Sequence, residues 1–597
     1  MDPVVIRREG GQPVFDLTKF DFLSGEAPPE VNPSLWRQAQ LNAQHTGLFE
    51  VSPGLYQVRS YDMANMTLIE GDTGWVLVDP LTASEVSAAA LQLANDTLGE
   101  RPVTGVVITH SHVDHYAGIY GVMTPERAAS GEVPIIAPAH FVEEALSENV
   151  LAGNVMGRRA TYMYGNLLKP GPQSFVSNGL GVTLALGSTG FAIPTDFIQR
   201  TGETRLIDGI EIEFQMTPGT EAPAEFVFYL PKFKALCMAE ITSHHLHNVY
   251  TPRGAQVRDA LAWSAQINES LERFGPRLDV EFASHHWPTW GRDAVAEYLR
   301  KQRDLYKYIH DQTLRLANKG FNKEEIAEQL TLPDSLGQEF YNRDYYGTVS
   351  HNSRAVYVKY LGYFDGNPAN LHPLPPVTAA RHYLEFMGGA DAIVGKARPC
   401  YAAGEYRWVA EVLNHVVMAD PEHLPARALL ADTYEQLGYQ AESGPWRNFY
   451  LCGALELRQG LPQGSNYQVS PGVAEGMPIE DVAKLLAVQF IPAGVAGRTW
   501  SINLELSNPT LTCHLRVEHS VLHCFPDKDA KAATTLKGSA RAVKQLLLRR
   551  IPLVESDVEL MGDPKAVADL LGALDDFPRR FPLVTPREAP RAQFLSR

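Results

Sequence analysis

The chain has 597 residues, of which 20% are charged and 45% are apolar, the profile of an ordinary globular protein. Acidic residues outnumber basic residues by 69 to 52, so the formal net charge is −17. Binding to the phosphates of nucleic acid needs a surplus of Lys and Arg, and this balance therefore excludes a general nucleic-acid binder.

The first residues, MDPVVIRREGG, lack the apolar core of a signal peptide, and no apolar run reaches the length of about 18 residues that a membrane span needs. As written, the chain is expected in the cytoplasm. Removal of a signal before the numbering starts would place it in the periplasm or outside the cell. The five cysteines are an odd and sparse set, which predicts free thiols and no disulfide framework.

Strands and helices alternate in the first part of the chain. Residues 66–71 and 75–79 predict a hairpin, 84–98 a helix, and the apolar run 103–109 a strand buried on both faces. Further strands are predicted at 210–214, 225–230 and 235–238, and further helices at 255–273 and 292–318. This order favours a layered α/β domain, which we assign to residues 1–376.

Prolines at 373, 375 and 376 mark a change to Ala-rich helical sequence, assigned to a second domain over residues 377–470. Within it, residues 406–441 predict two helices joined at Asp420-Pro421. A Gly/Pro-rich linker follows over 459–478. Residues 471–597 form the third predicted domain, a small α+β module with helices at 479–490, 538–549 and 564–574. Its two alternating strands start near Trp500 and Leu511 and are joined by a turn at Asn508-Pro509.

The strongest local signal is Thr109-His110-Ser111-His112-Val113-Asp114-His115, directly after the apolar run. Three imidazoles and a carboxylate this close together are hard to explain by packing, because a buried histidine needs polar partners. Just past a strand, His110 and His112 can direct both rings to one metal ion, while Asp114 and His115 face a neighbouring position. Nitrogen and oxygen ligands of this kind suit zinc.

Further carboxylate and imidazole side chains stand at the ends of three predicted strands downstream. They are Glu221 in Thr217-Pro218-Gly219-Thr220-Glu221, Glu240 in Cys237-Met238-Ala239-Glu240, and one of the two histidines in Ala283-Ser284-His285-His286. Alternation along a strand puts neighbouring side chains on opposite faces, so only one of His285 and His286 is expected to bind metal, and His285 is preferred.

The His-x-His-x-Asp-His motif resembles that of the metallo-β-lactamase superfamily, over about residues 40–320. The resemblance implies an αββα sandwich with two adjacent metal ions. The commonest pattern has His in place of Glu221 and Asp in place of Glu240, whereas two glutamates are similar to the alkyl sulfatase branch. Other strings agree with that branch over nearly the whole chain: Leu246-His247-Asn248, His285-His286-Trp287-Pro288, Thr348-Val349-Ser350-His351-Asn352 and Tyr363-Phe364-Asp365-Gly366-Asn367-Pro368.

This resemblance implies a hydrolase that converts alkyl sulfates such as dodecyl sulfate to an alcohol and inorganic sulfate. Two zinc ions per chain would hold a bridging hydroxide. One ion would be bound by His110, His112 and Glu221 and the other by Asp114, His115 and His285, with Glu240 as the bridge. The resemblance also implies a helical dimerisation domain, hence a homodimer, and a sterol-carrier-like C-terminal domain.

A sulfate monoester needs fixed cationic and hydrogen-bonding groups. Arg253 can offer a two-donor fork, and Tyr346, His351 and Asn352 are further candidates for contacts to the sulfate. His247 is the candidate general acid, seven residues after Glu240, with His244 and His245 as alternatives. The other role open to His247 is to orient Glu240. Cleavage at either the S–O or the C–O bond fits this set of residues.

Two other functions are compatible with parts of the pattern. A lactonase or thioesterase of the same superfamily would use a similar metal centre, and a lipid-binding scaffold would keep only a relict of it. The glutamate at 221 and the lipid-type C-terminal module favour the sulfatase over the other hydrolases, and the complete set of seven candidate ligands argues against the scaffold.

Overall fold

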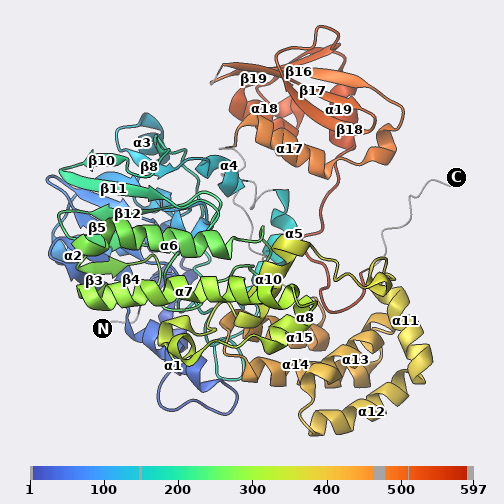
Figure 1. Cartoon of the computed structure of the whole chain (residues 1–597). Coiled ribbons are helices and arrows are strands. Elements are labelled where there is room, and N and C mark those ends of the chain that lie inside the picture. Colours follow the sequence, from blue (N-terminus) through green and yellow to red (C-terminus); the bar gives the residue numbers. More distant parts are fainter. Residues whose placement is uncertain (1–3, 147–150, 462–476, 509, 588–597) are drawn as a thin grey trace. The chain divides into compact units, whose positions relative to one another are not determined.

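The computed structural model describes residues 4–146, 151–461, 477–508 and 510–587 (Figure 1). It contains two compact units. The first comprises residues 1–145, 156–467 and 581–587, and the second comprises the remaining parts of the chain. The predicted three-domain boundaries at 376 and 470 stay a prediction. Most of the predicted linker at 459–478, and Pro509 of the predicted turn, lie outside the described residues.

Two sheets form the first unit's centre. The seven-stranded sheet has the order β3 (Gly47–Ser52), β4 (Leu55–Arg59), β5 (Met66–Glu70), β6 (Trp75–Val78), β7 (Val103–Val107), β8 (Ile135–Pro138), β9 (Asp196–Ile198). The six-stranded sheet has the order β10 (Thr204–Ile207), β11 (Ile210–Met216), β12 (Phe226–Leu230), β13 (Ala235–Cys237), β14 (Val280–Phe282), β15 (Thr289–Trp290). β5 and β6 form the predicted hairpin.

The two sheets pack face to face, and the alternation of side chains along β12 shows how. Phe226 and Phe228 point into the core between the sheets, where they join residues of the other sheet such as Val76 and Val107. Val227 and Tyr229 point the other way, into a second apolar cluster with the helices α6 (Ala260–Phe274) and α7 (Arg292–Ala317). These helices run alongside each other (Figure 1).

The helix α2 (Ser84–Leu98) packs beside the seven-stranded sheet. It buries Val86, Ala90 and Ala94 on one stripe, and Asn95 accepts a hydrogen bond from the Trp75 indole at 2.9 Å. Helices therefore cover the outside of both sheets, and the predicted αββα sandwich is confirmed. The unit also contains the short hairpin β1 (Val5–Arg7) and β2 (Pro13–Asp16) and the helices α1 (Pro33–Gln44), α3 (Pro125–Ser130), α4 (Phe141–Leu146), α5 (Gly153–Met163), α8 (Lys323–Gln329), α9 (Asp334–Gly337) and α10 (Val349–Leu361).

One predicted helix starts later than the sequence pattern suggests. The prediction was 255–273, but α6 begins at Ala260, because the Asp259 carboxylate accepts hydrogen bonds from the backbone N–H groups of Leu261 and Ala262 and caps the helix. Residues 250–258 are consequently free to form a loop, and this loop carries Arg253 and Arg258 to the site described below.

Five helices follow in the same unit: α11 (Pro376–Met387), α12 (Ala390–Ala402), α13 (Tyr406–Ala419), α14 (Leu424–Gln440) and α15 (Gly444–Gln459). They share one apolar core, to which Val409, Leu413 and Val416 contribute from α13 and Leu430 from α14. The predicted helical region and its Asp420-Pro421 turn are thus confirmed.

The second unit contains the predicted α+β module. Its five-stranded sheet has the order β18 (Val521–Pro526), β17 (Leu511–Glu518), β16 (Trp500–Ser507), β19 (Thr534–Ser539), β20 (Glu559–Gly562). Its helices are α17 (Ile479–Gln489), α18 (Ala540–Leu547) and α19 (Pro564–Gly572). Alternate residues Ile502, Leu504 and Leu506 of β16 are buried, so they form the core of the module.

The cysteines and the helix lengths agree with the sequence-based expectations. All five cysteines are free thiols. In the described part of the chain, no helix combines the length and the apolar character that crossing a membrane requires.

Candidate metal centre

Four strand ends meet at one edge of the sandwich and carry the seven candidate ligands. β7 leads into His110, His112 and a 3₁₀ turn at Val113–His115, whereas the segments after β11, β13 and β14 carry Glu221, Glu240 and His285. A β-bridge between His110 and Glu225 connects the two sheets at this edge. The fold therefore brings together residues up to 175 positions apart in the sequence, from His110 to His285.

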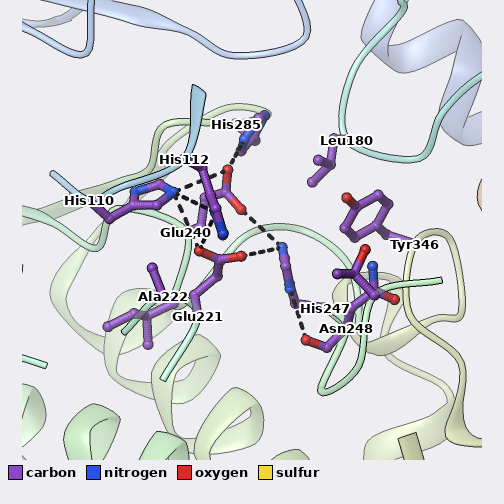
Figure 2. Close-up of polar contacts among 12 residues, drawn as sticks. His110, His112, Leu180, Glu221, Ala222, Glu240, His247, Asn248, His285 and Tyr346 are labelled. Carbon is purple, nitrogen blue, oxygen red and sulfur yellow. Dashed lines mark hydrogen bonds and ion pairs between the residues drawn. The ribbon is translucent and has the colours of Figure 1, made fainter. Parts of the chain in front are cut away.

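The candidate ligands form two groups, each with its ligand atoms within 4.8 Å of one another and with all side chains buried. One group is His110, His112, Glu221 and Glu240, and the other is Asp114, His115, Glu240 and His285. Glu240 belongs to both groups, as a bridging carboxylate would. Figure 2 shows Glu240 between His285 and the pair formed by His110 and His112.

Contacts within each group are short. In the first group, Oε2 of Glu221 lies 2.9 Å from His112 Nδ1 and 3.3 Å from His110 Nε2. In the second, His115 Nε2 lies 2.7 Å from Glu240 Oε1 and 3.3 Å from Asp114 Oδ2. His285 Nε2 also contacts Glu240 Oε1.

The donor set fits a divalent metal. Asp114 Oδ2 and Glu221 Oε2 are buried and lie against imidazole nitrogens of the same groups, and a buried carboxylate oxygen is costly unless a cation or donor faces it. His and carboxylate donors in two four-membered groups match the ligand types of paired zinc sites.

Asp79 fixes the orientation of His115 and of the strand end beside it. Its carboxylate accepts hydrogen bonds from Thr109 N–H and Oγ1, both at 2.8 Å, from Ser284 Oγ at 2.6 Å, and from His115 Nδ1 at 3.0 Å. Because Nδ1 of His115 carries the proton toward Asp79, the lone pair of Nε2 faces the ligand group.

His110 and His285 are oriented in the same way. The Thr109 hydroxyl donates its hydrogen to Asp79, so it can only accept from His110 Nδ1, which lies 2.9 Å away. His285 Nδ1 donates to the Met63 carbonyl at 2.8 Å. In both rings Nε2 is left as the metal-facing nitrogen. His286, the alternative to His285, points elsewhere, with its Nδ1 accepting from the His244 backbone N–H.

Glu221 is held by Arg258 and by the loop that Glu225 supports. Arg258 Nη2 lies 2.5 Å from Glu221 Oε1. Glu225 is fully buried and accepts hydrogen bonds from the backbone N–H groups of Glu221 and Ala222 and from Thr220 Oγ1. Burial and the nearby Glu221 charge raise the pKa of Glu225 to about 8, so this carboxyl is mostly neutral at pH 7 and acts as a structural support of the loop.

His247, the predicted general acid, lies between the two carboxylates of the centre. Its Nε2 is 2.9 Å from Glu240 Oε2 and 3.6 Å from Glu221 Oε1 (Figure 2). Arg258 Nη1 donates to its Nδ1 at 3.0 Å. Nδ1 is therefore an acceptor, the proton sits on Nε2, and it points at Glu240. Burial lowers the pKa of His247. These contacts favour the orienting role over the acid role.

Arg253 stands in the loop over residues 250–258, and Tyr346 packs against His247. Tyr346 is buried, its ring centroid is 5.0 Å from that of His247, and its hydroxyl is 3.4 Å from the hydroxyl of Tyr164. Burial raises the pKa of both phenols, and the positive charge of Arg253 opposes that shift. Figure 2 shows Tyr346 and the apolar Leu180 across His247 from His110.

His351 and Asn352 support a neighbouring residue instead of facing the metal centre. The Asn352 side chain donates to the His247 carbonyl and accepts from the Val249 N–H, so both ends of its amide are used. His351 Nε2 lies 2.8 Å from Asn248 Oδ1, and its Nδ1 accepts from the Trp446 indole N–H at 2.9 Å. Both residues thus shape the segment 247–249.

The hydrogen bonds around Asn248 leave its amide nitrogen available. The indole N–H is only a donor, so Nδ1 of His351 is an acceptor and Nε2–H donates to Asn248 Oδ1. Asn248 Nδ2 is buried and has no protein acceptor in the described ranges. Burial lowers the pKa of His351 to about 3, so this ring stays neutral and the arrangement does not change near pH 7.

Four residues of the site were not identified as functional from the sequence: Asp79, Asn248, Arg258 and Trp446. Asp79 directly follows a predicted strand, and the strand-end rule that found Glu240 could have found it. Asn248 stood in a recognised motif but was given no role. Arg258 and Trp446 carry no local signal, because their partners lie at other places in the sequence.

Comparisons with known proteins agree along the chain. The metallo-beta-lactamase superfamily model matches residues 60–285, the alkyl sulfatase dimerisation model residues 322–460, and the alkyl sulfatase C-terminal model residues 468–586. The dimerisation match thus begins upstream of residue 377, where the sequence pattern placed the helical domain.

Three similar proteins cover nearly the full length. A linear primary-alkylsulfatase of a Pseudomonas species is 46% identical, over 97% of this chain and 87% of the relative. An alkyl/aryl-sulfatase of Saccharomyces cerevisiae is 44% identical, over 98% of this chain and 91% of the relative. The solved structure of the stereoselective inverting sec-alkylsulfatase Pisa1 from Pseudomonas sp. superposes with a TM-score of 0.95 at 42% identity, covering 98% of this chain and 94% of that one.

Replacement of Asp79 by Asn tests whether Asp79 orients His115, a member of the second ligand group. The amide cannot accept all the hydrogen bonds that the carboxylate accepts, and His115 loses its fixed orientation. We expect the affinity for Zn²⁺, measured by competition with a chromophoric chelator, to fall by about 10–100-fold. Asp311→Asn, at an exposed position of α7, is the control and should not change the affinity. Equal zinc affinity of the Asp79→Asn and Asp311→Asn proteins would contradict the assignment.

Proposed function

Because the chain belongs to the alkyl sulfatase family of the metallo-β-lactamase superfamily, we propose that it hydrolyses alkyl sulfate esters such as dodecyl sulfate at a centre of two zinc ions. The products are an alcohol and inorganic sulfate. The observation that carries this proposal is the pair of buried ligand groups that share Glu240, together with the Asn248 amide nitrogen, which has no acceptor among the described residues.

The charge of two zinc ions would suit the net negative charge of the side chains in the centre. Asp114, Glu221 and Glu240 bring three carboxylates into a buried cluster, and Arg258 contributes one positive charge to it. Two divalent ions would compensate the remaining negative charge and leave the centre attractive to an anionic ester. Zinc bound there supplies Lewis-acid charge and eases the deprotonation of the attacking water. His110, His112 and Glu221 would hold one ion, and Asp114, His115 and His285 the other.

The protein's own groups would bind and orient the sulfate. Arg253 offers planar N–H donors that match two sulfate oxygens, and Asn248 Nδ2 offers a further donor whose direction is set by His351. The hydroxyls of Tyr164 and Tyr346, which lie 3.4 Å apart, are further candidate donors. The apolar side chain of Leu180, which Figure 2 shows beside Tyr346, is suited to the start of an alkyl chain.

His247 would act mainly by holding Glu240. With its Nδ1 occupied by Arg258, a second proton on this ring would displace a charged donor, which disfavours the imidazolium that a general acid needs. A neutral His247 donating to Glu240 Oε2 keeps that carboxylate turned with Oε1 toward both ligand groups.

A homodimer is part of the same proposal. The match to the alkyl sulfatase dimerisation model covers α11 to α15. These helices expose large apolar side chains, including Phe386 on α11, which is 90% exposed, and Leu424 on α14, which is 68% exposed. Apolar residues gathered on one set of helices are typical of a protein contact.

The alternative functions explain fewer of these contacts. A lactonase or thioesterase acts on uncharged carbonyl groups and has no need for the fixed cation of Arg253. A lipid-binding scaffold with a relict metal site would not depend on the hydrogen bonds that orient His110, His115 and His285.

Metal removal and reconstitution test the reaction directly. We expect the purified protein to hold about two zinc ions per chain and to release sulfate from dodecyl sulfate, and we expect a chelator to abolish this activity and zinc to restore it. His110→Ala and His285→Ala, one from each group, should each lower both the zinc content and the rate. His140→Ala, at an exposed position, serves as the control. Full sulfate release by the metal-free protein would contradict the proposal.

Replacement of Arg253 by Lys separates the sulfatase from hydrolases of neutral esters. Lysine keeps the charge but loses the planar pair of donors. We expect kcat/KM for dodecyl sulfate to fall by about 10–100-fold, because hydrogen bonds to a charged group contribute about 1.5–3 kcal/mol. Arg300→Lys, in an exposed pair with Glu297, should change nothing. If kcat/KM for dodecyl sulfate is the same in the Arg253→Lys and wild-type proteins, Arg253 does not bind the sulfate.

A double-mutant cycle tests whether Trp446 acts through Asn248. Trp446→Phe keeps the ring but removes the N–H that fixes His351, so His351 can change tautomer and Asn248 can turn its oxygen toward the sulfate. We expect kcat/KM for dodecyl sulfate to fall by about 5–10-fold, with unchanged zinc content. In an Asn248→Ala background the same substitution should have no further effect. Trp408→Phe, on the exposed side of α13, is the control. If the losses of kcat/KM from the two substitutions are additive, Trp446 does not act through Asn248.

A further inference from the structure

Four arginines are buried in the described part of the chain, and three of them have strong partners. Arg158 pairs with Glu456, Arg258 pairs with Glu221, and Arg447 donates to the backbone carbonyls of Glu30, Pro172, Ser174 and Gly438. The fourth, Arg59 at the end of β4, is 4% exposed and donates through Nε to Gln57 Oε1 at 3.1 Å. The buried charge of Arg59 therefore has fewer hydrogen-bond and ion-pair partners than the charges of the other three arginines.

Arg59 has no direct acidic partner in the described part of the chain. Among the residues that the structure describes, no carboxylate forms an ion pair with Arg59, and its Nη2 atom has no acceptor. Its guanidinium lies over the Phe49 ring, 4.6 Å from the centroid. The charge acts on its surroundings: burial and Arg59 together lower the pKa of His244 to about 3. Burial lowers the pKa of Arg59 itself only to about 10, so it stays charged at neutral pH.

A small polar cavity lies against Arg59. Its lining includes Asn42, His45, Arg59, Met63, Gly181 and Trp287, and it leaves about 10 Å³ for the centre of a water-sized guest, which is room for one such guest. Asn42 Nδ2 is buried and, like Arg59 Nη2, has no acceptor in the described ranges. Asp62 also lines the cavity, but its two oxygens already accept backbone N–H groups of Met63, Thr82 and Ala185 at 2.8–3.0 Å.

We propose that this cavity is a binding site for a monatomic anion of the size of chloride or bromide, held between the guanidinium of Arg59 and the amide of Asn42. The positive charge of Arg59 and the two N–H groups without acceptors belong to residues that line a space of about the size of one water molecule, which is smaller than sulfate or a carboxylate. An isolated buried cation is costly, and an anion of this size supplies both the charge and the acceptor that the site needs.

The anion site is separate from the metal centre, but residues that line it also contact the centre. Met63 lines the cavity, and its carbonyl accepts the hydrogen bond that orients His285. Gly181 and Leu180 also line it, and Leu180 lies beside Tyr346 (Figure 2). The anion would therefore stabilise two parts of the site. One is the segment at Met63, which orients the candidate zinc ligand His285, and the other is the segment at Leu180, beside Tyr346.

Anomalous diffraction from bromide tests the site in the zinc-loaded protein. Crystals grown in bromide without chloride should show a peak at the bromine edge within about 3.5 Å of both Arg59 Nη2 and Asn42 Nδ2. Crystals grown in acetate should show no anomalous signal there. If the bromide crystals show an ordered density without an anomalous signal, the guest is water and the proposal is wrong.

Thermal unfolding provides a second test in solution. At constant ionic strength, exchange of gluconate for chloride or bromide should raise the Tm of the zinc-loaded protein by about 1–2 °C, with saturation. Arg59→Met should remove this halide dependence, whereas Arg101→Met, in a surface pair with Glu70, should keep it. If Arg59→Met does not fold, the bromide peak in the wild-type protein decides. A halide-independent Tm of the wild type, or halide dependence retained in Arg59→Met, would overturn the proposal.

Discussion

Buried negative charge is the constraint on which the site depends. Asp114, Glu221 and Glu240 lie together with little or no contact to solvent, and a buried carboxylate is stable only beside a cation or several donors. Arg258 forms the one ion pair from an arginine or lysine to these three carboxylates that the described residues show. Imidazole rings provide further contacts to these three carboxylates. In the proposed function, a pair of divalent ions would complete the charge balance of this arrangement.

The scaffold meets this constraint by joining two sheets at one edge. The bridge between His110 and Glu225 fixes the distance between the end of β7 and the loop that carries Glu221. Asp79 then connects Thr109, His115 and Ser284, which come from two different strand ends. Support also comes from the helical region, because Trp446 of α15 acts on His351 and through it on Asn248. The helices after residue 376 therefore support the Asn248 side chain of the candidate site.

The parts of the site that the sequence predicted share a local signal. His110, His112, Asp114 and His115 stand within six residues of one another, and Glu221, Glu240 and His285 follow strands that the apolar pattern identifies. The fold class could be predicted for the same reason, since the periodicity of two and of 3.6 is local information. His351 and Asn352 show the limit: adjacency in a motif indicates a place near the site, but it does not tell whether a side chain faces substrate or backbone. Arg258 and Trp446 could not be found, because their roles arise only from contacts across the fold.

The most direct test of this account is the position of the metal ions. Diffraction data from crystals of the zinc-loaded protein, collected on both sides of the zinc absorption edge, locate the ions without reference to activity. The account predicts two anomalous peaks about 3.5–4 Å apart, one beside His110, His112 and Glu221 and one beside Asp114, His115 and His285, with Glu240 in contact with both. A single peak, or a pair of peaks that Glu240 does not join, would contradict it.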